Sequence, residues 1–247
     1  MKVMERSYEA VERAMKPVAA DLVFGYGVPT SIDTAYELAD QLYPEIMGRR
    51  RRMIRDEAES IAKDHPFLVI PDGDRYPLTA TRKMVVNSAG LAPKPRLAQV
   101  EMYDPATREM QTTSIAPYLA PDMEDMQVEM GRRLATATAR HIKGASRELV
   151  IRTARENRTG WARQLSGSEN CAFCAMLVSR GAVYTKDTAR FETHDHCNCT
   201  ATLVDGPEWD GRDEAERLYT LWRRSEGLAE FGKKYREEFG FVGMAAT

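Results

Sequence analysis

Few features of this sequence point to a secreted or a membrane protein. Its 247 residues include only 4 cysteines, and charged residues interrupt the N-terminal stretch every few positions, where a signal peptide would need an unbroken apolar run. The uncharged run that starts at Met110 and ends before Asp122 is too short to cross a bilayer, and it contains Pro117 and Pro121. We therefore expect a soluble protein that is made in the cytosol and has no membrane partner.

The chain also lacks a large excess of either positive or negative charge. The 35 Lys and Arg nearly balance the 37 Asp and Glu, giving a formal net charge of −2, so any affinity for nucleic acid has to come from local patches. One stretch, between Gly131 and Arg163, carries only two acidic residues among nine basic ones. This stripe is either a solvated helix face or a surface for phosphate or an acidic protein. Its basic residues are Arg132, Arg133, Arg140, Lys143, Arg147, Arg152, Arg155, Arg158 and Arg163.

The first two-thirds of the chain has mainly helical patterns. After Ser31, a candidate N-cap, apolar residues recur at spacings of three and four through Ile46, and Pro44 should kink or interrupt that helix. The arginine-rich stretch that follows, at 49–55, indicates a solvated charged segment. The short apolar run Phe67–Ile70 is consistent with a strand or a loop.

Prolines dominate the middle of the chain, and helical patterns return after it. Between Pro71 and Pro121 we predict one short helix, Thr79–Ala89, with loops or edge strands around it. A second long helix begins at Asp122, with Gly144 as a candidate stop. A helix capped by Asp213 follows later, and the aromatic tail at 231–241 either packs back on the body or frays.

These patterns predict a fold that is mainly α, with a small α+β zinc-binding module near the C-terminus. We expect an N-terminal helical and proline-rich docking region at 1–120. A helical core with a Cys/His metal module should span 121–205, and a C-terminal helix and tail should span 206–247.

All four cysteines lie within one short segment of the chain. Cys171 and Cys174 form a C-x-x-C, and His194, His196, Cys197 and Cys199 follow about twenty residues later. Thiolate and imidazole ligands at this spacing are typical of tetrahedral zinc rather than calcium or magnesium. We predict a structural Zn²⁺ site. His194 with Cys197 or Cys199 would complete a Cys3His set, with His196 as an alternative ligand, and the spacing leaves that choice open.

Three other interpretations of the cluster remain. A thioredoxin-like redox motif lacks a preceding βαβ pattern, and oxidation in a virion could form a disulfide such as Cys171 to Cys199. A catalytic zinc, as in nucleases of the H-N-H type, would need an open coordination position and a general base. Three or more thiolates favour a closed structural site instead. The sequence neighbours that could act as the base are Glu169, Glu192 and Asp195.

Catalytic motifs are missing elsewhere. The sequence contains no G-x-S-x-G, no P-loop and no dinucleotide-binding fingerprint. His65 and His141 are better explained as structural residues than as ligands. We therefore expect that the protein is not an enzyme, with a zinc-dependent nuclease or a DNA-binding zinc module as the alternative.

The cluster and its flanks resemble the phage Mu F-like minor head proteins, in the form found in tailed phages of actinobacteria. The stretches that carry this resemblance are Arg158–Trp161, the C-x-x-C and residues 175–177, Arg180–Tyr184 and His194–Cys199. The family pattern, a C-x-x-C followed by H-x-x-C-x-C, falls on Cys171, Cys174, His194, Cys197 and Cys199, and His196 is an additional residue.

The resemblance implies a minor capsid and head morphogenesis protein. Such a protein would sit in the virion, in the capsid interior or at the portal vertex, after assembly in the host cytoplasm. Its implied partners are the phage portal protein, the major capsid protein and packaged DNA, with copies arranged around the portal. Roles in DNA packaging or ejection would follow, and the chain offers no room after Cys199 for a sizeable fused domain.

Overall fold

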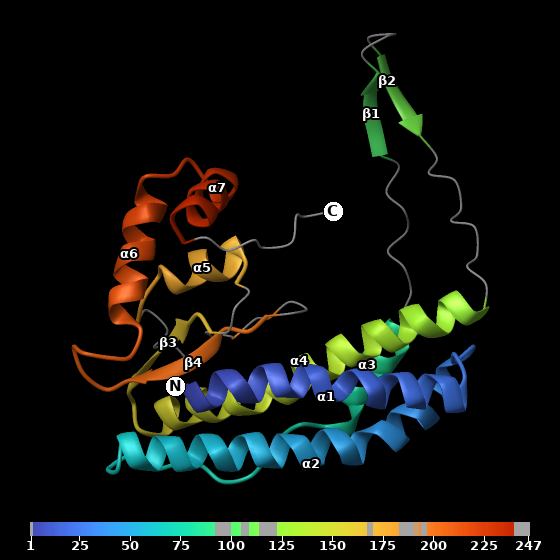
Figure 1. The fold of residues 1–247 in the computed structure, drawn as a ribbon, viewed down its shortest axis with the longest axis horizontal. Helices are drawn as coiled ribbons and strands as arrows, with labels where there is room; N and C mark the ends of the chain where they lie inside the picture. The colour runs from blue at the N-terminus through green and yellow to red at the C-terminus, as the bar shows by residue number, and fades with distance from the viewer. Residues whose placement is uncertain are drawn as a thin grey trace.

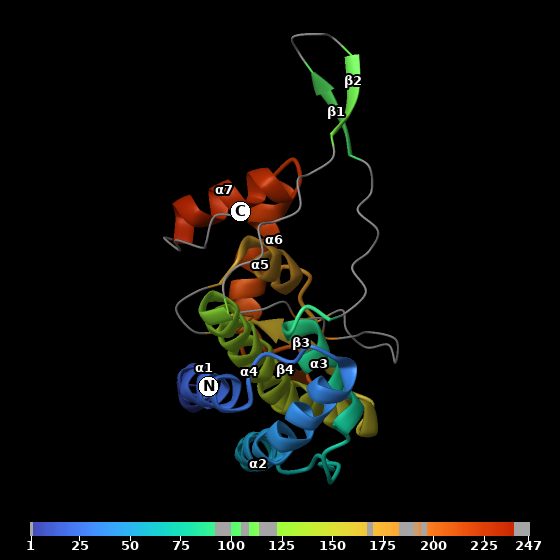
Figure 2. The same cartoon turned by 90° about the vertical axis from the view of Figure 1, so that its right-hand side faces the viewer.

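The structure is a computed structural model that describes residues 2–91, 100–104, 109–113, 123–166, 170–182, 191, 193 and 197–239. It is mainly helical, which confirms the predicted class, and its described residues also form two small antiparallel sheets of two strands each (Figure 1). Three long helices lie alongside one another as the helical body, and the cysteine-containing part lies at one end of it (Figures 1 and 2). The structure therefore separates a helical support from a smaller module.

Helix α1 (Lys2–Tyr26) packs one face on α4 (Met123–Glu156). Its buried residues recur every three or four positions, which is the period of one helical face. They join residues of α2, α3 and α4 in one continuous core. The buried residues of α1 are Tyr8, Val11, Met15, Ala19 and Val23.

Helix α2 (Ile32–Asp64) begins where the sequence predicts, at Ser31. The Ser31 side chain accepts a hydrogen bond from the Thr34 backbone N–H, and the Thr34 hydroxyl oxygen accepts one from the Ser31 backbone N–H. This reciprocal pair satisfies two backbone donors that a helix start otherwise leaves free. The helix stays continuous through Pro44, so the predicted interruption does not occur. Leu42 and Ile46, on either side of the proline, are fully buried and anchor this part of α2 in the core.

The arginine-rich part of α2 is not wholly solvated, contrary to our expectation. Arg50 is 1% exposed and donates hydrogen bonds to both carboxylate oxygens of Asp74, at 2.7 and 2.8 Å. It also donates to Glu148 at 2.7 Å and to the backbone carbonyl of His141 in α4. Its guanidinium lies 4.3 Å from the ring centre of Tyr76. One arginine thus joins α2, the following loop and α4.

The segment 66–77 is a loop, and the apolar run Phe67–Ile70 within it forms no strand. Phe67 is 96% exposed. The Asn157 side chain accepts a hydrogen bond from the Val69 N–H and donates one to the Val69 carbonyl, both at 2.8 Å. A side-chain amide therefore takes the place of a strand partner, because it offers both a donor and an acceptor.

Helix α3 (Leu78–Ser88) matches the predicted short helix to within one residue at each end. Beyond it, β1 (Val100–Asp104) and β2 (Glu109–Thr113) form an antiparallel hairpin with Val100 opposite Thr113. The hairpin stands apart from the helices in both ribbon views (Figures 1 and 2). The proline-rich stretch thus contains the predicted short helix, and the strands around it agree with the expected loops or edge strands.

Helix α4 runs without a break through Gly144, so this glycine does not end the helix as predicted. A β-carbon on Gly144 would lie 3.6 Å from Arg50 Nη1 and 3.6 Å from Glu148 Oε1. The glycine therefore lies beside the guanidinium of the buried Arg50, where α2 meets α4. Its position reflects packing between the helices and not a stop signal.

The C-terminal part packs around the antiparallel strands β3 (Gly160–Gln164) and β4 (Thr200–Val204). Inward side chains of the strands, among them Trp161 and Leu203, meet α4 and Ile61 of α2. Helices α5 (Ala172–Val178), α6 (Arg212–Arg223) and α7 (Leu228–Phe239) form a further core that includes three cysteines. Helix α6 confirms the predicted helix, but Asp213 does not cap it: the N-cap is Gly211, which makes no side-chain capping hydrogen bond, and Asp213 lies in the first turn. Phe231 and Tyr235 of α7 are fully buried, so the described part of the tail packs back on the body.

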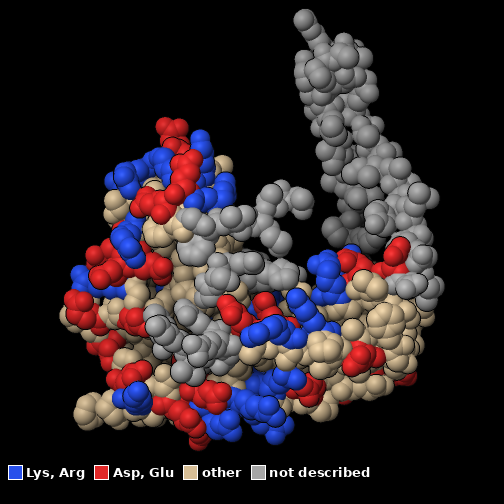
Figure 3. Space-filling model, viewed as in Figure 1, with Lys and Arg blue, Asp and Glu red and all other residues tan. Residues whose placement is uncertain are grey.

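The basic stripe of α4 is neither one solvated face nor one open binding face. Lys143, Arg147 and Arg163 are at most 2% exposed. Arg132 and Arg133 are exposed but pair with Glu129. On the face shown in Figure 3, basic and acidic groups are interspersed. The basic residues that lie close together in the sequence therefore point in different directions in the structure.

Candidate metal centre

The two halves of the cysteine motif come from different elements. Cys171 is the N-cap of α5, and its sulfur accepts a hydrogen bond from the backbone N–H of Cys174 at 3.4 Å. Cys174 lies in the first turn of the helix and is buried. Cys197 and Cys199 lie on the segment that leads directly into β4, and both are buried. The site therefore forms where a helix start meets the beginning of a strand.

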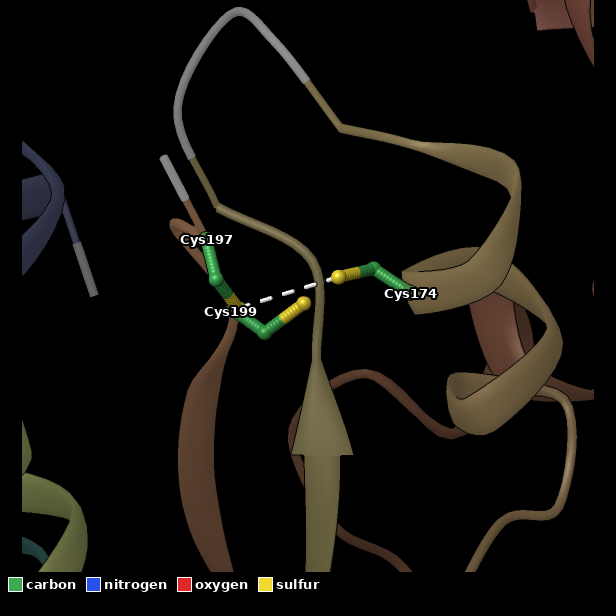
Figure 4. A group of neighbouring side chains, drawn as sticks. All are labelled: Cys174, Cys197 and Cys199. Carbon is green, nitrogen blue, oxygen red and sulfur yellow. Dashed lines mark hydrogen bonds between the residues drawn. The ribbon is translucent and has the colours of Figure 1, made fainter. Parts of the chain in front are cut away.

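Three sulfurs converge at this point. Those of Cys174, Cys197 and Cys199 all lie within 4.8 Å of one another (Figure 4). The sulfurs of Cys174 and Cys197 are 3.7 Å apart. A disulfide bond is about 2.05 Å long, and all four cysteines are free thiols. The predicted disulfide alternative, Cys171 to Cys199, is therefore not present in this structure.

Helix α4 fixes the backbone of the Cys197–Cys199 segment through the buried Arg147. The Arg147 guanidinium donates hydrogen bonds to the carbonyl of Cys199 at 2.8 Å and to that of Cys197 at 2.9 Å. The same nitrogen that binds the Cys197 carbonyl lies 4.0 Å from the Cys197 sulfur. The aromatic rings of Tyr8 and Phe191 lie 5.2 and 5.1 Å from this guanidinium. Arg147 thus both shapes the segment and brings positive charge to the sulfurs.

The residue between the two cysteines, Asn198, is held as firmly. Its side-chain oxygen accepts a hydrogen bond from Lys143 at 2.7 Å, and its carbonyl accepts one from the Ser166 hydroxyl. Lys143 in turn pairs with Glu12 of α1. The buried cation therefore links α1, α4 and the cysteine segment. A segment restrained in this way presents its sulfurs in a fixed geometry, which lowers the entropy lost on binding an ion.

The electrostatics of the cluster favour one thiolate. Hydrogen bonds from Cys174 and Cys199, together with the Arg147 guanidinium, hold the pKa of the Cys197 thiol well below its usual range. The hydrogen bonds that Cys174 makes to the other three sulfurs raise the pKa of its own thiol. The thiolate is the form that binds metals. One sulfur of the cluster is thus ready to bind before an ion arrives, and the others lose their protons on binding.

The donor set fits a tetrahedral thiolate site. Two sulfurs that each lie about 2.3 Å from a tetrahedral ion are separated by about 3.8 Å. The 3.7 Å between Cys174 and Cys197 agrees with that spacing. Buried sulfur donors suit zinc and other soft or borderline ions and do not suit calcium or magnesium.

The predicted ligands fall into three groups in the structure. Cys174, Cys197 and Cys199 come together. Cys171 lies at the edge of the cluster, partly exposed, with its sulfur hydrogen-bonded to Cys174. His194 and His196 lie outside the described residues, as do the predicted general-base candidates Glu169, Glu192 and Asp195. The fourth ligand therefore stays open between Cys171 and a histidine.

The supporting residues were not predicted as part of the site. Arg147 and Lys143 appear in the sequence only as members of the basic stripe, and Ser166 and Asn198 carry no motif. Lys143 and Arg147 are four residues apart in sequence, and this spacing places both on the same face of α4. A helical wheel combined with the cysteine motif could have suggested that this face meets the cluster.

The other two histidines are structural, as expected. The His141 ring forms a hydrogen bond with the Tyr76 hydroxyl at 2.7 Å. His65 Nδ1 lies 2.7 Å from an Asp205 carboxylate oxygen. Neither belongs to a group of three potential metal ligands within the described residues.

Comparison with known proteins assigns the chain to a family. The VG15 protein family matches residues 87–225, which includes the whole cysteine cluster and more than half of the chain. This chain belongs to the VG15 protein family. The matched region begins at the end of α3 and ends just after α6, so it contains α4, the β3–β4 sheet and the candidate metal centre.

Relatives of the VG15 chain include two phage proteins. It is 27% identical over 176 residues to the Gene 15 protein of Mycobacterium phage L5, covering 53% of this chain and 56% of the relative. It is 28% identical over 127 residues to the Gene 15 protein of Mycobacterium phage D29, covering 36% of this chain and 46% of the relative. The chain spans about half the length of the curated relatives it matches. These relatives support a bacteriophage origin.

No solved structure matches the chain. No helix among the described residues is long and apolar enough to cross a membrane. The family and relatives' names do not mention heads, portals or capsids, so the resemblance to Mu F-like minor head proteins stays a prediction.

Proposed function

We propose that this VG15-family chain is a structural protein of a phage particle. It acts as a minor capsid and head morphogenesis protein that binds the portal protein and performs no catalysis. Within it, Cys174, Cys197 and Cys199 hold a structural zinc ion together with a fourth ligand, either Cys171 or His194. The phage relatives support the first part of this proposal, and the converging sulfurs support the second.

The observation that carries the proposal is the meeting of the buried sulfurs under the support of Arg147. When bound, zinc would supply a cross-link between the start of α5 and the start of β4. This chain's own residues provide everything else: Arg147 and Lys143 orient the cysteine segment from the middle of α4. The result is a rigid C-terminal module fixed to a long helical support.

A structural role accounts for the burial of the donors better than catalysis does. Cys199 is fully buried, and Cys174 and Cys197 are 2% and 3% exposed. A catalytic zinc needs a coordination position that substrate can reach. Three thiolates also donate enough charge to weaken the ion's action as a Lewis acid. The described groups that hold the cysteine segment, Arg147 and Asn198, bind backbone or other side chains, and neither is a general base.

The proposed partner is the portal protein, with copies of this chain arranged around it in the capsid interior or at the portal vertex. Long helices and a protruding hairpin offer docking surface on several sides (Figure 2). Contacts with the major capsid protein and packaged DNA are also part of this proposal. Any DNA contact would use the exposed arginines of α4, such as Arg132, and would weaken as salt rises.

The first test measures metal and stability on the same sample. Purified, reduced protein should contain about one zinc per chain, and a strong chelator should lower its melting temperature. The Cys174→Ser variant should lose both the metal and the response to chelator. Comparing Cys171→Ser with His194→Gln identifies the fourth ligand, because only the true ligand's loss should weaken zinc binding. The zinc site would be contradicted if the wild-type protein contained no metal and its melting temperature did not change with the chelator.

The second test measures assembly. The chain should co-purify with the portal protein of the same phage at low salt, and the Cys174→Ser variant should bind less. Absence of any association would overturn the portal role while leaving the zinc site intact. Cleavage of duplex DNA by wild-type protein, lost on chelation or in Cys174→Ser, would instead establish the nuclease alternative.

A further inference from the structure

A second concave site lies away from the cysteines. It is a cavity of about 410 Å³ between the C-terminal turns of α2 and strand β4, closed at one end by the chain between β4 and α6. Its volume lies within the range of binding pockets. Carboxylates and residues of β4 line it, together with Gln164 at the end of β3, Ser166, and apolar side chains such as Ile61 and Trp209.

The charge of the lining is of one sign. Five carboxylates face the cavity, and no lysine or arginine is among its lining residues. Two of them have cationic or imidazole neighbours: Asp205 meets His65 at 2.7 Å, and Glu208 meets Arg212 at 2.6 Å. Within the described part of the chain, the other three form no ion pair. These three are Glu57, Asp64 and Asp210.

Glu57 shows how burial acts on a carboxylate of this cavity. It is partly buried, and the loss of hydration raises the pKa of its carboxyl to about 7. A carboxylate in this position is stabilised by an arriving positive charge more than an exposed one would be. The cavity therefore favours cationic groups and disfavours phosphate and nucleic acid.

The cavity also follows the free edge of a strand. Four consecutive residues of β4, Thr200 to Leu203, line it. Side chains of a strand alternate between two faces, so this run of consecutive residues indicates that the cavity reaches the edge of β4, and Gln164 of the paired strand β3 lines it as well. Strand β4 pairs with β3 along its other edge, and no third strand joins it within the described part of the chain. Edges of this kind accept an added strand.

A divalent metal fits the site less well than a peptide does. No three of these carboxylates and His65 bring their ligand atoms within 4.8 Å of one another, because the only such group among the described residues is the cysteine cluster. The acidic groups are instead distributed along the cavity from α2 to the chain before α6. A ligand that uses all of them has to be elongated and to carry more than one positive charge.

We propose that this cavity binds an extended, lysine- or arginine-containing segment of a partner protein. The segment adds a third strand to the β3–β4 sheet through the free edge of β4, and its cationic side chains meet Glu57, Asp64 and Asp210. The site is separate from the candidate metal centre and does not depend on portal binding. It gives the C-terminal module a second, sequence-tolerant contact, because main-chain hydrogen bonds provide much of the affinity.

The experiment uses the full chain and a fluorescein-labelled hexapeptide of alternating lysine and valine. Anisotropy should show saturable binding, and the matching peptide of alternating glutamate and valine should bind at least about tenfold more weakly. The double variant Asp64→Asn, Asp210→Asn should lose at least about tenfold in affinity. Both positions are exposed, so the variant should fold. The matched control, Glu45→Gln with Glu129→Gln, removes two carboxylates elsewhere and should bind as wild type does.

Backbone pairing is tested separately by N-methylation of the lysine–valine peptide. One peptide is methylated at its lysine amides and the other at its valine amides. Because only alternate amides of an added strand face its neighbour, one of the two should lose binding and the other should keep it. Equal binding by both methylated peptides, or equal losses in the cavity and control variants, would overturn the proposal. The proposal would also be overturned if spermidine displaced the peptide completely and bound with the same affinity as the peptide. That result would show a site for small polyamines.

Discussion

At the residue scale, two buried arginines determine how the parts of this chain are held together. Arg50 connects α2 to α4, and Arg147 connects α4 to the cysteine segment. Each is at most 2% exposed and donates to backbone carbonyls as well as to other partners. A buried guanidinium is costly unless its donors are satisfied. These residues therefore fix specific contacts between elements, which a hydrophobic side chain at the same position would leave undetermined.

Replacing Arg147 should damage the metal centre without touching a ligand. Arg147→Met leaves the carbonyls of Cys197 and Cys199 buried without a donor, and we expect a loss of about 3 kcal/mol in the free energy of unfolding. Zinc affinity should fall with it. Urea unfolding with and without chelator measures both effects. Arg132→Met, which removes an exposed arginine of the same helix, serves as the control, and an equal loss in both variants would contradict the role of Arg147.

Glu57 should make the protein less stable as the pH rises. Its folded-state pKa of about 7 lies above the usual value of 4.5, so folding favours the protonated form. The penalty is small below pH 4.5, grows between 4.5 and 7, and is constant above 7. Nearby Tyr8 does not titrate here, because burial raises its pKa to about 12.

The variant Glu57→Gln removes this penalty. Relative to wild type it should gain roughly 2 kcal/mol in the free energy of unfolding between pH 5 and pH 8. Denaturant titrations of both proteins at the two pH values measure the difference. A constant difference between variant and wild type across this range would show that Glu57 ionises normally.

At the scale of elements, tertiary packing overrides two local signals. Pro44 does not interrupt α2, and Gly144 does not end α4. Both residues are weak helix formers, yet Pro44 lies exposed between the buried Leu42 and Ile46, and Gly144 lies against the buried Arg50. By contrast, the Ser31 cap and the start of α3 follow the sequence closely, because these signals act within a few residues.

Two helical glycines should respond differently to replacement by alanine. A β-carbon at Gly144 meets its nearest atoms at 3.6 Å, an ordinary contact, so Gly144→Ala should stabilise the protein by about 0.5–1 kcal/mol. At Gly232 the new carbon would lie 3.1 Å from the Ala172 β-carbon beside the cysteine cluster. Gly232→Ala should therefore gain nothing or lose stability. Thermal unfolding measures the stability of both variants. An equal gain in stability for the two would contradict the prediction that the space around each glycine decides the effect.

At the scale of the whole molecule, charged side chains join segments that are far apart in sequence. Lys143 links α1 to the cysteine segment, and Arg50 links the loop after α2 to α4. These contacts therefore cross the expected division at 120/121, although the division of the chain into regions stays a prediction. Loss of one such link should weaken the protein as a unit.

Asp74 provides the test of this larger connection. Although its burial opposes ionisation, hydrogen bonds from Arg50 hold the pKa of the Asp74 carboxyl below its usual range. The stabilisation is present above the usual aspartate pKa and is lost as the pH falls through the lower folded-state value. Asp74→Asn should cost about 3 kcal/mol at pH 7 and less as the pH falls below about 4. Asp40→Asn, which breaks an exposed pair with Arg82, should cost far less, because solvent screens that pair.

The sequence alone determined the features that depend on local spacing. These are the mainly helical class, the capped start of α2, helices α3 and α6, and the grouping of cysteines that suit a soft metal. Tertiary structure decided which members of a pattern are used. The basic stripe divided into buried Lys143 and Arg147 of α4, buried Arg163 of β3, and exposed neighbours, because each element is covered on some sides and open on others. Likewise, only the packing of α2 against β4 created an acidic cavity, since its lining comes from segments about 140 residues apart.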